Sequence, residues 1–294
     1  MMGSFTQKLI TLTFKLGTGT FGETGSNIVT FSGLRCTVQI VAAGGPSMGQ
    51  ASIRIFGLTM SQMNSLSSVV RQADGQIATR LNSIQITAGD SSSMPVIFQG
   101  QVTSAIIDMS GMPDTAMVFA AHAGAFEAIK IVPASSYPGA ADAAVILATL
   151  AQQNGYAFEN NGVSVLLSTP YFSGSPRDQM LACVRAAGIE WNGLDNGTLA
   201  IWPRGGYRGQ ANNVPLISAA TGMIGYPVNR DYAITVRTLF NPQVLNGQVF
   251  EIQSSLAYAN GKFIAHEIAH DISCEMPGGP WFSTFTGTPL NAQS

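Results

Sequence analysis

The stretch Leu9-Ile10-Thr11-Leu12-Thr13-Phe14-Lys15-Leu16 decides the first part of the fold, because apolar and polar residues alternate along it. Side chains of a strand point alternately to opposite faces, so this pattern predicts a strand with one buried face. The same alternation returns several times before residue 120, and clusters of Gly and Ser separate the copies. The further predicted strands are 36–41, 51–56, 83–87, 96–102 and 115–119. Short strands with regular turns favour a barrel or a sandwich.

One short helix is predicted within this β region, at residues 61–70. Ser61 is a suitable N-cap residue. Met63, Leu66 and Val70 fall on one stripe of such a helix, which would face the core.

Residues 141–203 change character and predict a small α/β domain. A helix at 141–154 is Ala-rich, is apolar at Val145, Ile146 and Leu150, and ends at Asn154-Gly155. A second helix at 175–188 has stronger signals at both ends. At its start, Ser175 is the N-cap, Pro176 suits the first turn and Asp178 completes a capping box. Gly188 ends the helix. Its apolar face consists of Met180, Val184 and Ala187.

Each of these helices precedes a stretch that predicts a hairpin. The first hairpin pairs 156–158 with 163–165 across Asn161-Gly162, and the second pairs 189–191 with 199–201 across Asn196-Gly197. The two helix–hairpin copies are offset by 33 residues, from Gly155 to Gly188, which indicates a weak internal duplication. Beyond residue 204 the β pattern returns, with predicted strands at 232–237, 246–252, 262–273 and 281–286.

The composition of the 294 residues is unusual in charge. Asp, Glu, Lys and Arg make up 10% of the chain, whereas a soluble globular protein carries about 25%. A net charge of −2 argues against a nucleic-acid-binding face, an electrostatic membrane binder and an acidic disordered tail. Either uncharged polar side chains cover the surface, or much of it is buried against other subunits. The second explanation is our first hypothesis.

The chain carries no sign of export or membrane insertion. Cys36, Cys183 and Cys274 lie far apart without a C-x-x-C spacing, which is typical of a protein made in a reducing cytoplasm. Lys8 and Lys15 interrupt the apolar residues near the N-terminus, so we expect no signal peptide. The longest apolar run, 143–151, is half of what a membrane span needs, so we expect a soluble chain without stable membrane insertion.

Two motifs resemble catalytic signatures. Gly17-Thr18-Gly19-Thr20-Phe21-Gly22 matches G-x-G-x-x-G, but a strand at 27–31 follows it instead of the helix that a dinucleotide site needs, so we interpret it as a hairpin loop. His266-Glu267-Ile268-Ala269-His270 matches the H-E-x-x-H signature of zinc peptidases, which requires a helix. Here β-branched residues at every second position predict a strand, with Glu267 on the face opposite both histidines, and no later His supplies a third ligand.

The remaining candidates fit structural roles better than catalytic ones. His122 has no nucleophile arranged beside it, and Asp108 and Asp114 flank a turn. The scattered aromatics Phe21, Phe31, Trp191, Trp202 and Trp281 are interpreted as core residues. We therefore predict that the chain is not an enzyme, and that it has no catalytic, cofactor-binding or metal-binding residues and no cofactor.

Taken in order, several segments resemble the tail-hub proteins of bacteriophages, particularly the baseplate hubs of contractile-tailed phages. These segments are 53–58 leading into the helix at Ser61, the strand 96–102, the helix 176–188 with 189–191 and 197–201, the stretch 239–252, and 261–271 running on to Trp281. In the hub pattern a Gly is followed by a strand, then by His-Asp, and then by a strand that contains Trp. The resemblance therefore explains His270-Asp271 without a zinc site. Each motif alone is weak, and their order makes the case.

The resemblance implies an α+β, mainly β fold with two tail-tube-like β-barrels and a small helix–hairpin α/β domain between them. We expect the first barrel at 1–125, the α/β domain at 126–208, and the second barrel with the C-terminal tail at 209–294. An alternative boundary gives strands from 115–132 to the second barrel.

The implied function is structural: a homotrimeric baseplate hub in the virion, assembled in the host cytoplasm. It would join the hexameric tail tube above to the central spike below, and form part of the channel for the tape measure protein and DNA. Contacts to baseplate wedge or tape measure proteins are also expected, and sequence-specific nucleic-acid binding is not. Two alternatives stay open: a zinc metallopeptidase using the HEIAH motif, and a hexameric tail-tube or distal-tail ring protein.

Overall fold

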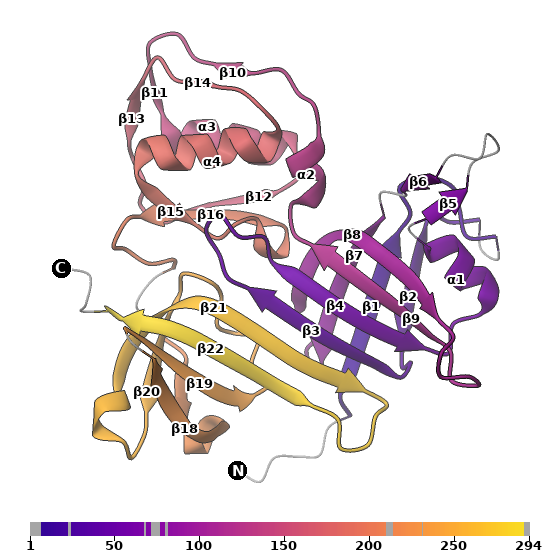
Figure 1. The fold of residues 1–294 in the computed structure, drawn as a ribbon. Helices are drawn as coiled ribbons and strands as arrows, with labels where there is room; N and C mark the ends of the chain where they lie inside the picture. The colour runs from indigo at the N-terminus through magenta and orange to yellow at the C-terminus, as the bar shows by residue number, and fades with distance from the viewer. Residues whose placement is uncertain are drawn as a thin grey trace. The chain divides into compact units, whose positions relative to one another are not determined.

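The computed structural model describes residues 7–22, 25–67, 69–71, 77–79, 82–209, 214–230 and 232–290 (Figure 1). Strands dominate and helices are few, which confirms the predicted α+β, mainly β class. The chain divides into two compact units, and neither is a continuous stretch of sequence. Unit 1 takes the described residues up to Ile40, Gln50–Ala123 and Asp271–Trp281. Unit 2 takes Val41–Gly49, Gly124–His270 and the described residues from Phe282 onward.

Unit 1 is built from an antiparallel sheet. Along the sheet the strands follow the order β3, β4, β9, β8, β7, β1, β2. Their bounds are β1 (Leu9–Lys15), β2 (Ile28–Ser32), β3 (Cys36–Ala42), β4 (Gln50–Phe56), β7 (Ser83–Gly89), β8 (Val96–Asp108) and β9 (Ala116–His122), and β5 (Val69–Arg71) pairs separately with β6 (Ile77–Thr79). Each strand predicted between residues 9 and 119 is therefore confirmed.

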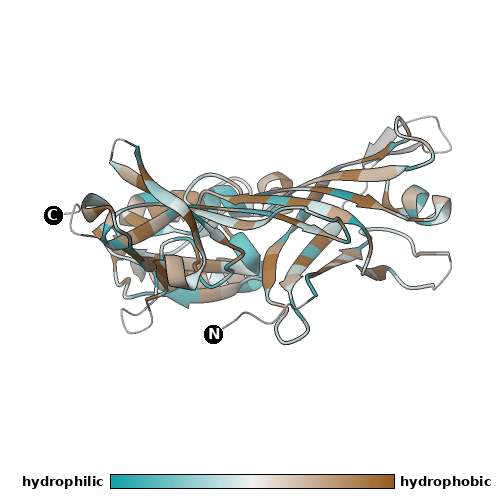
Figure 2. Cartoon of the chain, turned by 90° about the horizontal axis from the view of Figure 1, so that it is seen from below, coloured by the Kyte–Doolittle hydropathy of each residue, from teal (hydrophilic) through white to brown (hydrophobic). Residues whose placement is uncertain are grey.

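Alternating burial explains why these strands form. In β1, Ile10, Leu12 and Phe14 are buried, while the threonines between them are only partly covered. Phe14 packs against Phe119 of β9 with ring centroids 4.7 Å apart, so the two strands share one apolar core. Figure 2 shows the same outcome along the chain, where apolar and polar residues follow one another in short bands on the strands.

The predicted helix in this region is confirmed, but the prediction of Ser61 as its N-cap is wrong. Helix α1 (Met60–Leu66) is capped by Thr59, whose side chain accepts a hydrogen bond from the Gln62 backbone N–H, while the Gln62 side chain accepts one from the Thr59 N–H. This reciprocal pair requires Gln three residues after the cap, which Thr59 has and Ser61 lacks. Met63 and Leu66 are buried as predicted, but the helix ends at Leu66, and Val70 belongs to β5.

Unit 2 contains the two helices that the sequence predicts between residues 141 and 188. Helix α4 (Pro176–Ala187) has the predicted capping box between Ser175 and Asp178, and Gly188 ends it in the left-handed conformation at φ 64°. Helix α3 (Ala143–Gln153) is capped by Asp142. Its buried face includes Ile146 and Leu150 as predicted, whereas Val145 is 63% exposed. The short elements around them are α2 (Ala125–Ile129), β10 (Ser135–Ser136), β11 (Ala140–Asp142), β13 (Leu166–Ser168) and β14 (Tyr171–Phe172).

The first predicted hairpin is wrong and the second is confirmed. Strands β15 (Ile189–Trp191) and β16 (Thr198–Pro203) pair antiparallel, with the 3₁₀ turn η1 (Asp195–Gly197) before β16. Strand β12 (Ala157–Asn160) instead pairs in parallel with β16, and residues 163–165 form no strand. The Asn160 side chain hydrogen-bonds both the N–H and the carbonyl of Val163, which closes a tight loop there. The duplication therefore extends to a helix followed by one strand, not to a hairpin.

The remaining strands of unit 2 form a second sheet region. They follow the order β18, β19, β22, β21, and β20 pairs antiparallel with β21 and parallel with β17. The bounds are β17 (Leu216–Ser218), β18 (Met223–Arg230), β19 (Ala233–Leu239), β20 (Val249–Gln253), β21 (Gly261–Cys274) and β22 (Trp281–Pro289), with 3₁₀ turns η2 (Ala219–Thr221) and η3 (Ala257–Ala259). Phe250 and Phe285 are fully buried in this part of the core. In neither unit do the described strands close into a complete barrel.

No described helix has the length and apolar character that crossing a membrane would require.

Gly247 provides a test of the packing in unit 2. Its φ is +82°, and a Cβ built on it would lie 2.6 Å from the Trp202 ring. Gly162 has a similar φ of +89°, but a Cβ there meets nothing within 4 Å. We expect Gly162→Ala to lower the free energy of unfolding by about 1 kcal/mol through backbone strain alone. Gly247→Ala should cost about 3 kcal/mol because overpacking adds to the strain.

Denaturant unfolding of the two variants beside the parent chain measures both free energies. Equal losses at the two positions would contradict the packing of Trp202 against Gly247.

Candidate functional site

The HEIAH motif lies on strand β21, as the sequence predicted. His266 and Glu267 are exposed, whereas His270 is buried. His266 Nε2 lies 2.6 Å from Thr288 Oγ1, and His270 Nδ1 lies 2.8 Å from Ser283 Oγ. The two imidazoles therefore take separate partners and do not share the helix face that an H-E-x-x-H zinc site uses.

His270 acts as a structural anchor. Burial lowers its pKa to about 4, so the imidazole is neutral at pH 7. Ser283, which contacts it, also accepts a hydrogen bond from the Asn241 N–H at 2.9 Å, and the Phe240 ring meets the imidazole edge-on at 5.4 Å between centroids. The histidine thus joins β21, β22 and the turn at Asn241. Over the residues that the structure describes, no group of three His, Cys, Asp or Glu side chains is arranged to hold a metal.

The glycine-rich motif is a hairpin loop. It follows β1 and leads to β2, and these two strands pair antiparallel. The Leu16 N–H donates to the Asn27 carbonyl at 2.8 Å, and the Gly17 N–H donates to Asn82 Oδ1 at 3.1 Å. A strand follows the glycines where a phosphate-binding loop needs a helix, which confirms the structural interpretation.

The other candidate residues have structural partners. His122 Nδ1 lies 3.0 Å from Thr103 Oγ1 on the neighbouring strand. Asp108 pairs with Arg54 at 2.7 Å, and Asp114 pairs with Arg35 at 3.0 Å. Four of the five aromatics named from the sequence are buried, and Trp281 is half-buried: the buried ones are Phe21, Phe31, Trp191 and Trp202.

The most concentrated polar chemistry surrounds Arg177 in unit 2, which the sequence analysis missed. Arg177 Nη1 donates to the Gly193 carbonyl at 3.2 Å, and Nη2 donates to the carbonyls of Pro46 and Ser47 at 3.0 and 3.2 Å. The guanidinium carbon lies 5.3 Å from the centroid of the Trp191 ring. Arg177 is only 5% exposed. A signal was present in the sequence, since Arg177 falls on the same helical stripe as Met180 and Val184 and so points inward.

Asp195 lies near this guanidinium. Burial raises the Asp195 pKa to about 7, against the opposing effects of Arg177, Arg208 and the Gly49 N–H. Among the described residues, Asp195 Oδ2 and Trp191 Nε1 are buried without a hydrogen-bond partner. Asp195 is thus a carboxyl group that changes protonation close to neutral pH.

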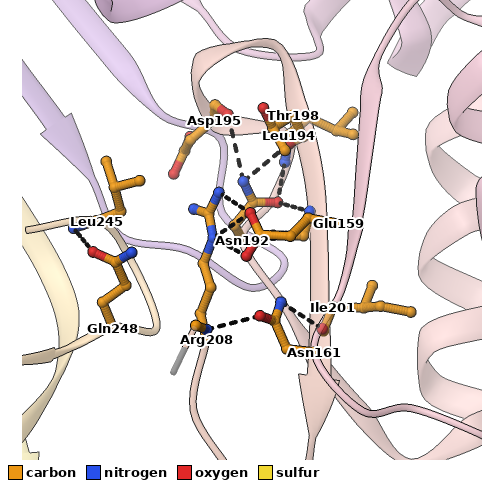
Figure 3. Close-up of polar contacts among 12 residues, drawn as sticks. Glu159, Asn161, Asn192, Leu194, Asp195, Thr198, Ile201, Arg208, Leu245 and Gln248 are labelled. Carbon is orange, nitrogen blue, oxygen red and sulfur yellow. Dashed lines mark hydrogen bonds and ion pairs between the residues drawn. The ribbon is translucent and has the colours of Figure 1, made fainter. Parts of the chain in front are cut away.

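Figure 3 shows a neighbouring network in the same unit. Arg208 binds Glu159 through two nitrogens, with Nη2 2.6 Å from Oε2 and Nε 3.1 Å from Oε1. Burial raises the Glu159 pKa, but the hydrogen bonds and charge of Arg208 outweigh it, and the net shift is downward. Asn161 joins the Gly209 N–H to the Ile201 carbonyl, and Asn192 holds the turn before β16 through Thr198 and Ala200. These groups bind backbone and one another, so their role is to fix loops.

Arg177→Met tests the Arg177 cluster. The variant leaves the buried Gly193 carbonyl and the carbonyls of Pro46 and Ser47 without this donor, and we expect it to lower the free energy of unfolding by about 3 kcal/mol. Arg185→Met on the same helix is the matched control, because Arg185 is exposed, and it should change stability by less than about 0.5 kcal/mol. Denaturant unfolding measures both. A loss for Arg177→Met as small as that of the control would contradict the burial of the guanidinium.

Asp195→Asn tests the raised pKa. Because the folded-state pKa lies above the unfolded one, the carboxylic acid stabilises the fold below about pH 4, and this contribution is lost as the pH rises through about 7. The Asn variant stays neutral, so its free energy of unfolding relative to the parent should rise by a few kcal/mol between pH 4 and 8. Unfolding at several pH values measures this, with exposed Asp114→Asn as control. A constant difference across this range would refute the assignment.

The family model described as "Baseplate hub gp41" matches residues 9–277. No curated protein sequence matches the chain.

Solved structures share the fold at very low sequence identity. A tail protein from Neisseria meningitidis MC58 has a TM-score of 0.63 at 8% identity, over 95% of this chain and 96% of that one. The E. coli c3393 protein has a TM-score of 0.60 at 9% identity, over 88% and 74% of the two chains. It is described as a component of the type VI secretion system with structural similarity to the T4 bacteriophage tail proteins gp27 and gp5.

The 43 kDa tail protein of prophage MuSo2 from Shewanella oneidensis has a TM-score of 0.58 at 10% identity, over 97% and 99%. At these identities the likenesses show the fold alone. The family match covers most of the chain, from the first strand of unit 1 to the turn after β21. This chain therefore belongs to the baseplate hub gp41 family.

Proposed function

We propose that the chain is a non-catalytic, homotrimeric baseplate hub that joins the hexameric tail tube to the central spike. The observation that carries the proposal is the family match over residues 9–277. Membership of that family supports a structural role in the phage tail baseplate and a place in the virion. Three copies, each contributing two tube-like halves, would present six similar surfaces to a hexameric tube.

The arrangement of the chain in three parts is included in this proposal. The first tube-like part is 1–125, the small α/β part is 126–208, and the second tube-like part with the tail is 209–294. Neighbouring copies would complete the barrels. The ring would leave a channel for the tape measure protein and DNA, and assembly would take place in the host cytoplasm.

A spike below the ring and a tube above it are the proposed neighbours, with wedge or tape measure proteins as further contacts. One of the structures of similar fold is described as resembling both gp27 and gp5 of T4, two tail proteins. The low charge of the chain favours burial of its surface in such an assembly. The buried and partnered polar residues described above favour a structural role over catalysis.

Light scattering of the purified full-length chain tests the stoichiometry. We expect three times the mass of one chain, and a threefold ring at the tail tip in a reconstruction of the virion. Six copies in the ring would favour the tail-tube or distal-tail alternative instead. A monomer both in solution and on the virion would refute the hub.

A further inference from the structure

Two buried cysteines lie together in unit 1. Cys36 begins β3 and Cys274 ends β21, and these strands are neighbours in the sheet. The backbone N–H of Cys274 donates a hydrogen bond to the sulfur of Cys36. The two residues are 2% and 1% exposed, and both are free thiols.

This placement suits a disulfide bond. The two residues stand at the ends of neighbouring strands, and the spacing of adjacent strands, about 4.7–4.9 Å, lies within the Cα–Cα range of about 4.4–6.8 Å that a disulfide spans. The Cys36 sulfur already contacts the backbone of Cys274, so the strands need not move apart or slide for the sulfurs to meet.

The same surroundings keep the thiols reduced during synthesis. Burial, and then the neighbouring Cys274, raise the pKa of Cys36 to about 12. Since the thiolate is the reactive form, Cys36 remains a thiol in a reducing cytoplasm.

We propose that Cys36 and Cys274 form a latent disulfide that closes when the protein meets an oxidising environment. The oxidant is a small-molecule disulfide that diffuses to the site. One cysteine thiolate displaces a thiol from the oxidant and forms a mixed disulfide, and the second cysteine then attacks that sulfur and releases the other thiol. The protein loses two hydrogens, and the oxidant is reduced to two thiols.

Cys274 is the thiol that local opening exposes first. It is the last residue of β21, directly before the turn that leads to β22, and Glu275 in that turn has a φ of +53°. The Cys274 sulfur donates to the Lys8 carbonyl at 3.3 Å, close to the start of β1. Only a strand end and its turn must open for the oxidant to enter, so the reaction is slow but does not require global unfolding.

The bond would fasten the last segment of unit 1, Asp271–Trp281, to β3. Because it joins residues far apart in sequence, it would remove much freedom from the unfolded chain. This inference does not depend on the proposed function, and it holds for the chain whatever its stoichiometry.

The experiment incubates the full-length protein with oxidised glutathione in native buffer, alkylates the remaining thiols, digests the protein and maps the peptides by mass spectrometry. We expect a linked peptide pair containing Cys36 and Cys274, lighter by two hydrogens. Cys183 is the internal control, because it is also buried and its pKa is also raised to about 12, but the contact near its sulfur is the Ala143 carbonyl. It should remain alkylated.

Thermal unfolding supplies the second measurement. The oxidised protein should melt at least about 5 °C higher than the reduced protein, a difference that a reductant abolishes and that Cys274→Ala does not show. The absence of the linked pair after prolonged oxidation below the melting transition would overturn the proposal. Linkage of Cys183 to either partner at a similar yield would also overturn it, since it would indicate reaction of the unfolded chain.

Discussion

The guanidinium group of Arg177 is the interaction on which unit 2 depends most. It comes from helix α4, and it binds the carbonyls of Pro46 and Ser47 in the segment Val41–Gly49, and that of Gly193. A buried cation is costly unless its donors are satisfied, and a buried carbonyl is costly without a donor. The hydrogen bonds of Arg177 therefore hold helix α4, the segment Val41–Gly49 and the turn at Gly193 in a single arrangement.

Sequence reasoning succeeded where one local signal decides the structure. Alternation predicted the strands of unit 1 and placed HEIAH on a strand, and the Ser175 capping box fixed helix α4 at both ends. It failed where distant partners decide. Residues 156–158 are predicted as half of a hairpin, yet strand β12 (Ala157–Asn160) pairs in parallel with β16, some forty positions later. The stripe of helix α4 places Arg177 inward, but its acceptors on Pro46 and Ser47 lie about 130 positions earlier and leave no local pattern.

The low charge of the chain is seen on the exposed surface of one described strand. Strand β18 carries no charged side chain from Met223 to Asn229, and Ile224, Tyr226 and Val228 on it are exposed. Pro227 and the register shift between Ile224 and Val228 interrupt this edge strand, and both features discourage pairing without the use of charge.

The discontinuous course of the chain also bears on how it folds during synthesis. In unit 1 the segment Asp271–Trp281 is synthesised only after Gly124–His270, which belongs to unit 2. A domain that awaits a distant segment forms contacts of long sequence separation, which slows folding. The sheet of unit 1 therefore keeps an unpaired edge at β3 while Gly124–His270 is synthesised, and an unpaired strand edge is open to premature pairing.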